Sequence, residues 1–123
     1  MRSNNYKDLI VWQKSVELVA EIYHFTETFP STEKFGLVSQ MRRSAISIPS
    51  NIAEGSKRGT KKDFCQFLVI AFGSGAELET QIEISKRLSL SKGQNYHTAE
   101  SLLEEIMRML NKTIQVMRSA AKN

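Results

Sequence analysis

The chain has a single cysteine, no long apolar run and no recognisable leader segment. Cys65 cannot form a disulfide within the chain, and a lone cysteine in an apolar helix is usually a small packed residue rather than a nucleophile. No stretch of about 18 consecutive apolar residues occurs, so we expect no transmembrane helix. Residues 1–7 lack the apolar region of a signal peptide, which predicts a cytoplasmic protein.

Sequence patterns that carry catalysis are also missing. Strand patterns are nearly absent, so no Gly-rich segment follows a strand as it does in a phosphate-binding loop. Glu21 and His24 form one Glu-x-x-His motif, but a di-iron helix bundle needs this motif on two helices, and His97 belongs to none. Cys65 has no histidine at a spacing that indicates a catalytic dyad. We therefore predict no enzymatic activity and no cofactor. Bound iron or manganese would indicate the alternative, a metal-dependent enzyme.

What the chain does contain is helical periodicity along most of its length. With 123 residues, of which 41% are hydrophobic and 24% charged, it has the composition of one ordinary globular domain. Apolar residues recur at three- and four-residue steps in four segments that are joined by short links. The sequence therefore predicts an all-α fold, an antiparallel up-down-up-down four-helix bundle. It spans residues 1–123 as a single domain, with an ordered core at about residues 6–118.

Capping residues indicate where these helices begin. The apolar stripe of the first helix extends from about residue 7 to 28. Ser31 is a candidate N-cap for the second helix. Thr60, followed three residues later by Asp63, has the pattern of a capping box that opens the third helix. Ser91, with a glutamine three residues later, has the same pattern and predicts the start of the fourth.

Two places inside these helices are unusual. Pro49 lies within the second helix, where it removes a backbone donor at a cost of about 3 kcal/mol, so we expect a kink or a break near residues 45–49. The side chain of Asn51 and nearby serines can bond to backbone groups that such a kink frees. In the third helix, Gly73 and Gly75 each cost about 1 kcal/mol relative to alanine. Glycine persists where another backbone comes close, which predicts a tight helix crossing there.

A polar seam is expected between the second and third helices. If these helices pair about a turn near residue 59, Arg42 or Arg43 lies level with Glu77, and an ion pair between the helices is the simplest interpretation. Small polar side chains at the same levels complete the seam. A partly buried seam of this kind sets the register of two helices. Its members are Ser47, Asn51, Ser74 and Glu77.

The positive charge is gathered in one part of the chain. Residues 42–62 contain six lysines or arginines and one acid, a local charge of +5, whereas the whole chain carries +4. This asymmetry is typical of a surface that meets phosphates or an acidic partner, although a solvated loop is the alternative. No helix-turn-helix pattern occurs, so we expect binding to the nucleic-acid backbone rather than sequence-specific readout. The candidate nucleic-acid-binding residues are Arg42, Arg43, Lys57, Arg58, Lys61 and Lys62.

Several strings of residues resemble a known family. They include residues 8–14 (DLIVWQK), residues 40–55 (QMRRSAISIPSNIAEG) and residues 73–79 (GSGAELE). This pattern is similar to the four-helix-bundle proteins related to those encoded in bacterial ribosomal-RNA intervening sequences. The most specific part is the Asn-Ile-Ala-Glu-Gly core at residues 51–55, and the resemblance extends over residues 6–118.

The resemblance implies a fold, an assembly and a class of partners. It implies a four-helix bundle that assembles into a ring, typically a pentamer, with no established enzymatic activity. Similar proteins include the accessory variability proteins of diversity-generating retroelements, which bind a reverse transcriptase and nucleic acid through basic surfaces. Arg42 and Arg43 occupy the family's basic positions, whereas the four cations of residues 57–62 lie in a turn where the family varies.

Two functional hypotheses follow. The first is a non-catalytic oligomeric binding module that engages RNA or DNA, or a nucleic-acid enzyme such as a reverse transcriptase, through its basic face. The alternative is a structural or scaffolding ring protein that recruits a protein partner. In that case exposed aromatic side chains, such as Phe25, Phe72 or Tyr96, would line the interface. Neither hypothesis involves a membrane.

Overall fold

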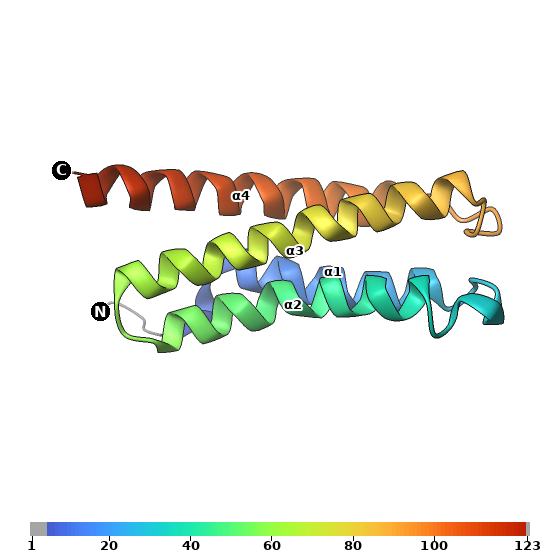
Figure 1. Ribbon diagram of the computed structural model, residues 1–123, viewed down its shortest axis with the longest axis horizontal. Coiled ribbons are helices and arrows are strands. Elements are labelled where there is room, and N and C mark those ends of the chain that lie inside the picture. Colours follow the sequence, from blue (N-terminus) through green and yellow to red (C-terminus); the bar gives the residue numbers. More distant parts are fainter. Residues whose placement is uncertain (1–4, 123) are drawn as a thin grey trace.

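The computed structural model describes residues 5–122, which form four long helices. Consecutive helices run antiparallel, each packs on the next, and the last packs back on the first (Figure 1). The predicted all-α up-down-up-down four-helix bundle is therefore confirmed. None of these helices is apolar enough over a sufficient length to cross a membrane. The elements in chain order are η1 (Tyr6–Asp8), α1 (Ile10–Thr26), η2 (Ser31–Glu33), α2 (Leu37–Lys57), α3 (Lys61–Arg87) and α4 (His97–Lys122).

The starts of the second and third helices test the capping predictions. Thr60 caps α3 as predicted, because its hydroxyl oxygen accepts a hydrogen bond from the Asp63 amide at 3.1 Å. The prediction that Ser31 opens the second helix is wrong: Ser31 begins the short 3-10 helix η2, and α2 begins at Leu37. Gly36 separates the two with φ −106° and ψ −108°, a backbone conformation outside the helical region.

The fourth helix begins later than the sequence predicts. It starts at His97 rather than at Ser91. Ser89 and Lys92 have positive φ angles of 54° and 53°, and a right-handed helix cannot pass through left-handed residues. The side chain of Asn95 accepts a hydrogen bond from the His97 amide at 3.0 Å, so an asparagine supplies the cap instead of Ser91.

Pro49 does not end the second helix. The prediction was a kink or a break near residues 45–49. α2 continues from Leu37 to Lys57 with Pro49 inside it, which excludes the break. The side-chain amide of Asn51 donates to the Ser47 carbonyl oxygen at 2.7 Å, which is the kind of side-chain support expected beside a proline. Pro49 is buried, so its ring contributes to packing at the position where it costs a backbone hydrogen bond.

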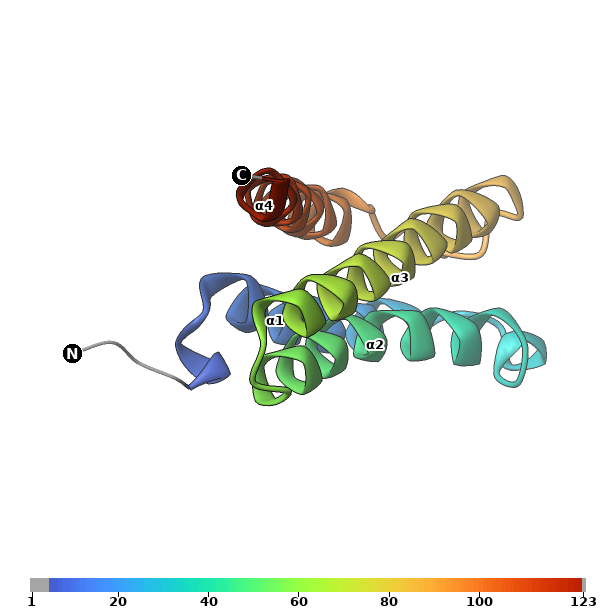
Figure 2. The ribbon, with the colours of Figure 1, turned by 60° about the vertical axis from the view of Figure 1, so that its left-hand side comes forward.

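The core lies along the bundle axis and takes one stripe of side chains from each helix. The largest fully buried apolar side chains are Leu18, Ile22, Met41, Ile48, Ile52, Leu68, Leu78, Ile106 and Leu110. At Gly75, α3 contacts α4, because a Cβ atom there would overlap the sulfur of Met107; the close neighbour is thus a side chain and not the backbone that the prediction invoked. Gly73 faces open space. Toward the start of α3 and the end of α4, the two helices separate (Figures 1 and 2).

Candidate nucleic-acid interface

The densest group of cations lies at one end of the bundle, where α2 turns into α3. We define the basic turn as residues 57–62, with the cations Lys57, Arg58, Lys61 and Lys62. The turn is tight because Gly59 adopts a φ angle of +93°, which side chains rarely tolerate, and Thr60 then caps α3. All four cationic side chains are exposed. The sequence therefore places four positive charges within one turn at the surface.

The four cations of the basic turn make different contacts within the chain. Arg58 forms an ion pair with Glu54 at 2.6 Å and stacks over the ring of Phe67 at 4.9 Å. Lys57 lies over the ring of Tyr6 at 6.0 Å. Within residues 5–122, neither Lys61 nor Lys62 forms an ion pair. Exposed ion pairs contribute at most about 1 kcal/mol, so Glu54 offers little resistance to a phosphate that approaches Arg58.

Arg42 is held by α1 rather than by the acids of α3. Its Nε donates to the Thr26 hydroxyl at 3.0 Å, a terminal nitrogen donates to the Tyr23 carbonyl oxygen at 3.3 Å, and the guanidinium lies 4.4 Å from the Tyr23 ring centre. These contacts join α2 to α1. The expectation that acids of the third helix occupy Arg42 is therefore wrong, and Arg42 has a packing role that the sequence pattern did not reveal.

Arg43 shares a shallow hollow with Glu77, as the register predicted, but the two do not form an ion pair. Both side chains are exposed. The amide oxygen of Gln81, which lines the same hollow, is buried without a hydrogen-bond partner. Arg43 lies about 21 Å along the axis of α2 from Lys57, at 1.5 Å per residue. The six candidate cations therefore occupy two separate regions rather than one surface.

The other predicted seam residues meet between α2 and α3. The hydroxyl groups of Ser47 and Ser74 lie 2.7 Å apart, and the side-chain amide of Asn51 donates to the Ser47 hydroxyl at 2.9 Å. Ser74 is buried, and Ser47 and Asn51 are half-buried. Glu77 takes no part in these hydrogen bonds. These hydrogen bonds join α2 to α3 through polar side chains.

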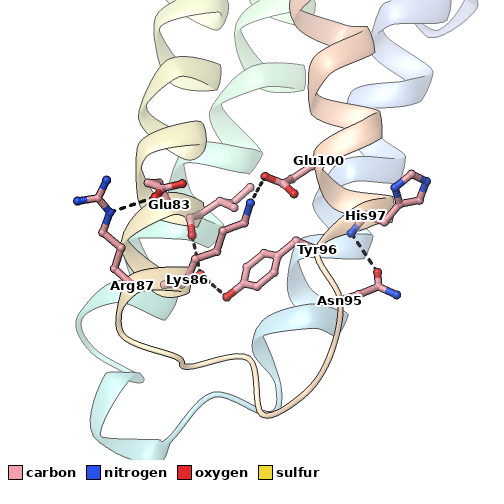
Figure 3. A network of polar contacts seen from close by, with 9 residues as sticks. Glu83, Lys86, Arg87, Asn95, Tyr96, His97 and Glu100 are labelled. Atoms are coloured by element: carbon pink, nitrogen blue, oxygen red, sulfur yellow. Dashed lines mark hydrogen bonds and ion pairs between the residues drawn. The ribbon is translucent and has the colours of Figure 1, made fainter.

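A second polar cluster lies at the opposite end of the bundle, where α3 meets α4 (Figure 3). Lys86 donates to Glu100 at 2.6 Å and lies over the ring of Tyr96, whose hydroxyl is 2.8 Å from that of Ser85. The Glu100 carboxylate raises the pKa of Lys86, against a smaller opposing effect of burial, so this lysine stays cationic. The cluster fastens the α3–α4 connection. The only sign of this cluster in the sequence was that charged residues, Lys86 and Glu100, lie on two helices that follow one another.

The described residues offer no metal-binding arrangement. Within residues 5–122, no three His, Cys, Asp or Glu side chains lie close enough together to hold a metal ion. His24 and His97 are both exposed and on different helices. Cys65 is half-buried in the wall of a groove between α3 and α4, with lysines and apolar residues around it.

The prediction that three aromatic side chains are exposed and available for an interface is wrong. Phe25 is buried in the core with 2% of its surface exposed, and Phe72 and Tyr96 pack against that core. Instead the exposed large apolar side chains include Phe35, Ile10, Leu88 and Val116. An apolar contact with a partner protein would therefore involve exposed apolar residues of this kind rather than the three aromatic residues.

Comparison with known proteins places this bundle in a family. The model of the 23S rRNA-intervening sequence protein family matches residues 7–112. A solved structure from Bacteroides thetaiotaomicron, described as a protein with unknown function from the S23 ribosomal protein family, is 28% identical with a TM-score of 0.79. The alignment covers 89% of this chain and 98% of that one. No curated protein matches. The chain therefore belongs to the 23S rRNA-intervening sequence protein family.

Proposed function

We propose that this protein is a non-catalytic oligomeric binding module that engages RNA or DNA, or an enzyme acting on nucleic acid, through the basic turn. The observation that carries the proposal is the exposure of four cations within one tight turn, three of which form no ion pair in the described chain. Arg42 is omitted because α1 already holds it. Arg43 remains a secondary contact for a ligand long enough to reach along α2.

Phosphate recognition is the chemistry that fits this turn. Lysine and arginine neutralise phosphates and release condensed counterions, which makes binding steeply dependent on salt. Four phosphate contacts on a single strand correspond to a slope of about −3 in a plot of log affinity against log salt concentration. The turn presents no helix to a groove, so the proposed contact is independent of base sequence.

Assembly would strengthen such a contact. We infer a ring of identical copies, a pentamer as in similar proteins, in which basic turns on one face act together. The potential of several turns adds, and each additional engaged turn raises the effective concentration of the rest. A reverse transcriptase with bound nucleic acid would present the same phosphates to this face.

The experiment compares two variants that lose equal charge. In the first, Lys57, Arg58, Lys61 and Lys62 become glutamine. In the matched control, four exposed cations elsewhere become glutamine: Lys34, Lys92, Arg108 and Lys112. Each set lowers the net charge from +4 to zero, so any effect of net charge is shared. Fluorescence anisotropy with labelled single-stranded RNA and with DNA, over a range of salt concentrations, measures binding.

We expect wild type and control to bind with the salt slope above, and the basic-turn variant to lose most of its affinity and flatten the slope. Equal losses in the two variants would show that net charge, rather than the basic turn, governs binding. Circular dichroism verifies that both variants stay folded.

The alternative function is a structural or scaffolding ring protein that recruits a protein partner. It is favoured by the apolar side chains that remain on the surface, including Val116 with 59% and Phe35 with 90% exposed. Affinity capture followed by nuclease digestion separates the two functions. Partners that stay bound after digestion support recruitment of protein, whereas partners released by digestion support binding through nucleic acid.

A further inference from the structure

A groove opens between α3 and α4 at one end of the bundle. The two helices are in contact where Met107 of α4 lies against Gly75. They separate toward the end of the bundle that carries the basic turn (Figures 1 and 2). The space between them is a hollow of about 760 Å³. We call it the α3–α4 groove. Its lining residues are Lys61, Lys62, Phe64, Cys65, Gln66 and Val69 of α3, and Val116, Met117, Arg118 and Ala120 of α4.

The floor and walls of the α3–α4 groove are apolar. Val69 and Val116 face solvent with 36% and 59% of their surface exposed, and Phe64, Cys65 and Met117 are half-buried behind them. The α3 residues Lys61, Cys65 and Val69 follow one another at four-residue steps, so they form one stripe of that helix. Along α3 the lining of the groove extends from Lys61 to Val69, about 12 Å, or a little over two helical turns. An occupant helix therefore needs an apolar face of about two to three turns within the groove.

The rim of the α3–α4 groove carries one sign of charge. Lys61 and Lys62 stand at the α3 side and Arg118 at the α4 side, and of the acidic residues in the described part of the chain none lines the hollow. Among the described residues none of these three cations forms an ion pair. Phosphates alone would satisfy the rim but leave the apolar walls in water. An occupant that satisfies both must combine an apolar face with carboxylates along its edges.

We propose that the α3–α4 groove is the docking site for an amphipathic helix of a partner protein, with apolar residues on one face and Asp or Glu beside them. Such a helix would lie between α3 and α4 as a fifth helix, with its apolar side chains against Val69, Val116 and Met117. Its acids would meet Lys61, Lys62 and Arg118, which selects against basic helices of equal hydrophobicity. The proposal goes beyond the nucleic-acid contact and does not depend on it.

The test needs no known partner. The full-length chain is immobilised and used to select from a displayed library of helical peptides long enough to present two to three turns to the groove, with no nucleic acid present. We expect enrichment of peptides with an apolar stripe flanked by Asp or Glu. An enriched peptide is then labelled and titrated with wild type, with Val69→Asp and with Val116→Asp. Ile70→Asp is the matched control, because Ile70 is 50% exposed on α3 but does not line the groove.

Binding in the α3–α4 groove predicts a loss of about ten-fold or more in affinity for Val69→Asp and Val116→Asp, and little change for Ile70→Asp. The double variant Lys61→Glu with Lys62→Glu is expected to lose the acidic peptide and gain one in which lysine replaces the acids. Cys65 is the chain's single cysteine, so its rate of alkylation reports directly on cover of the groove and is expected to fall when peptide binds.

Three results would overturn the proposal. The first is no enrichment, or enrichment of basic or uncharged helices. The second is an acidic peptide whose affinity is unaffected by both groove variants, which would locate the site elsewhere. The third is a change of oligomeric state in Val69→Asp and Val116→Asp but not in Ile70→Asp, measured by light scattering without peptide. That result would mean that a second copy of the chain occupies the groove.

Discussion

Two glycines in this bundle are expected to respond in opposite ways to the same substitution. Gly55 in α2 is buried, and a methyl group there would lie 2.6 Å from Phe67 Cβ and 3.2 Å from a ring carbon of Phe64. A Cβ atom moves only with its helix, so the substitution Gly55→Ala must push α2 and α3 apart. Gly73 lies on the exposed side of α3, where an added methyl group meets no atom within 4 Å.

The magnitudes follow from two opposing effects. Alanine in place of glycine inside a helix contributes about 1 kcal/mol, because it reduces the backbone freedom of the unfolded chain. Overpacking of a close helix contact costs about 1–3 kcal/mol. Gly73→Ala gains the first effect without the second, so we expect stabilisation of about 0.5–1 kcal/mol. Gly55→Ala has both effects. Gly55 lies near a helix end, where the gain from alanine is smaller, so we expect the free energy of unfolding to fall by about 1–2 kcal/mol.

Urea and thermal unfolding followed by circular dichroism measure both changes. At about 4 °C per kcal/mol for a chain of this size, Tm should rise by about 2–4 °C in Gly73→Ala and fall by about 4–8 °C in Gly55→Ala. Measurements at several protein concentrations separate folding from any assembly. A Gly55→Ala variant as stable as wild type would refute the close α2–α3 approach, and a destabilised Gly73→Ala would refute the assignment of that side of α3 to solvent.

Two further predictions concern charged residues. Arg42→Gln is expected to lower the free energy of unfolding by about 1 kcal/mol, since it loses hydrogen bonds and the Tyr23 contact, whereas the exposed Arg43→Gln should change it by less than about 0.5 kcal/mol; equal effects in urea unfolding would contradict the contrast. The raised pKa of Lys86 means that its interaction stabilises the fold below the ordinary lysine value of 10.5 and is lost as pH rises through the higher folded-state pKa. Stability should therefore decline in that alkaline range, and Glu100→Gln should remove this part of the decline; an unchanged alkaline limb in the Glu100→Gln variant would contradict the pairing.

The helices themselves were predictable because the signals that form them are local. Apolar spacing at three and four residues identified the stripe of each helix that meets the core, and Thr60 with Asp63 located the start of α3. The starts of α2 and α4 were not predictable in this way. Ser31 and Ser91 have the chemistry of caps, but the backbone conformations of Gly36, Ser89 and Lys92 decide where the right-handed helix begins.

Residue pairing across helices was predictable only in part. The antiparallel register correctly brought Ser47 to Ser74, and it brought Arg43 to the level of Glu77. It did not reveal that Arg42 turns away from α3 to Tyr23 and Thr26, because the direction of a side chain depends on how its helix is rotated in the bundle. The same rotation buries Phe25, which sequence spacing alone left available for a partner.

Composition and spacing along the chain were sufficient for the fold class and for the concentration of positive charge, since both depend on neighbours within a few residues. The division of that charge into two regions required the tertiary structure, because about 21 Å of α2 separates Arg43 from Lys57. The α3–α4 groove likewise exists only in the folded bundle. Its walls come from residues 61–69 and 116–120, which lie far apart in the chain and line one hollow only because α3 packs beside α4.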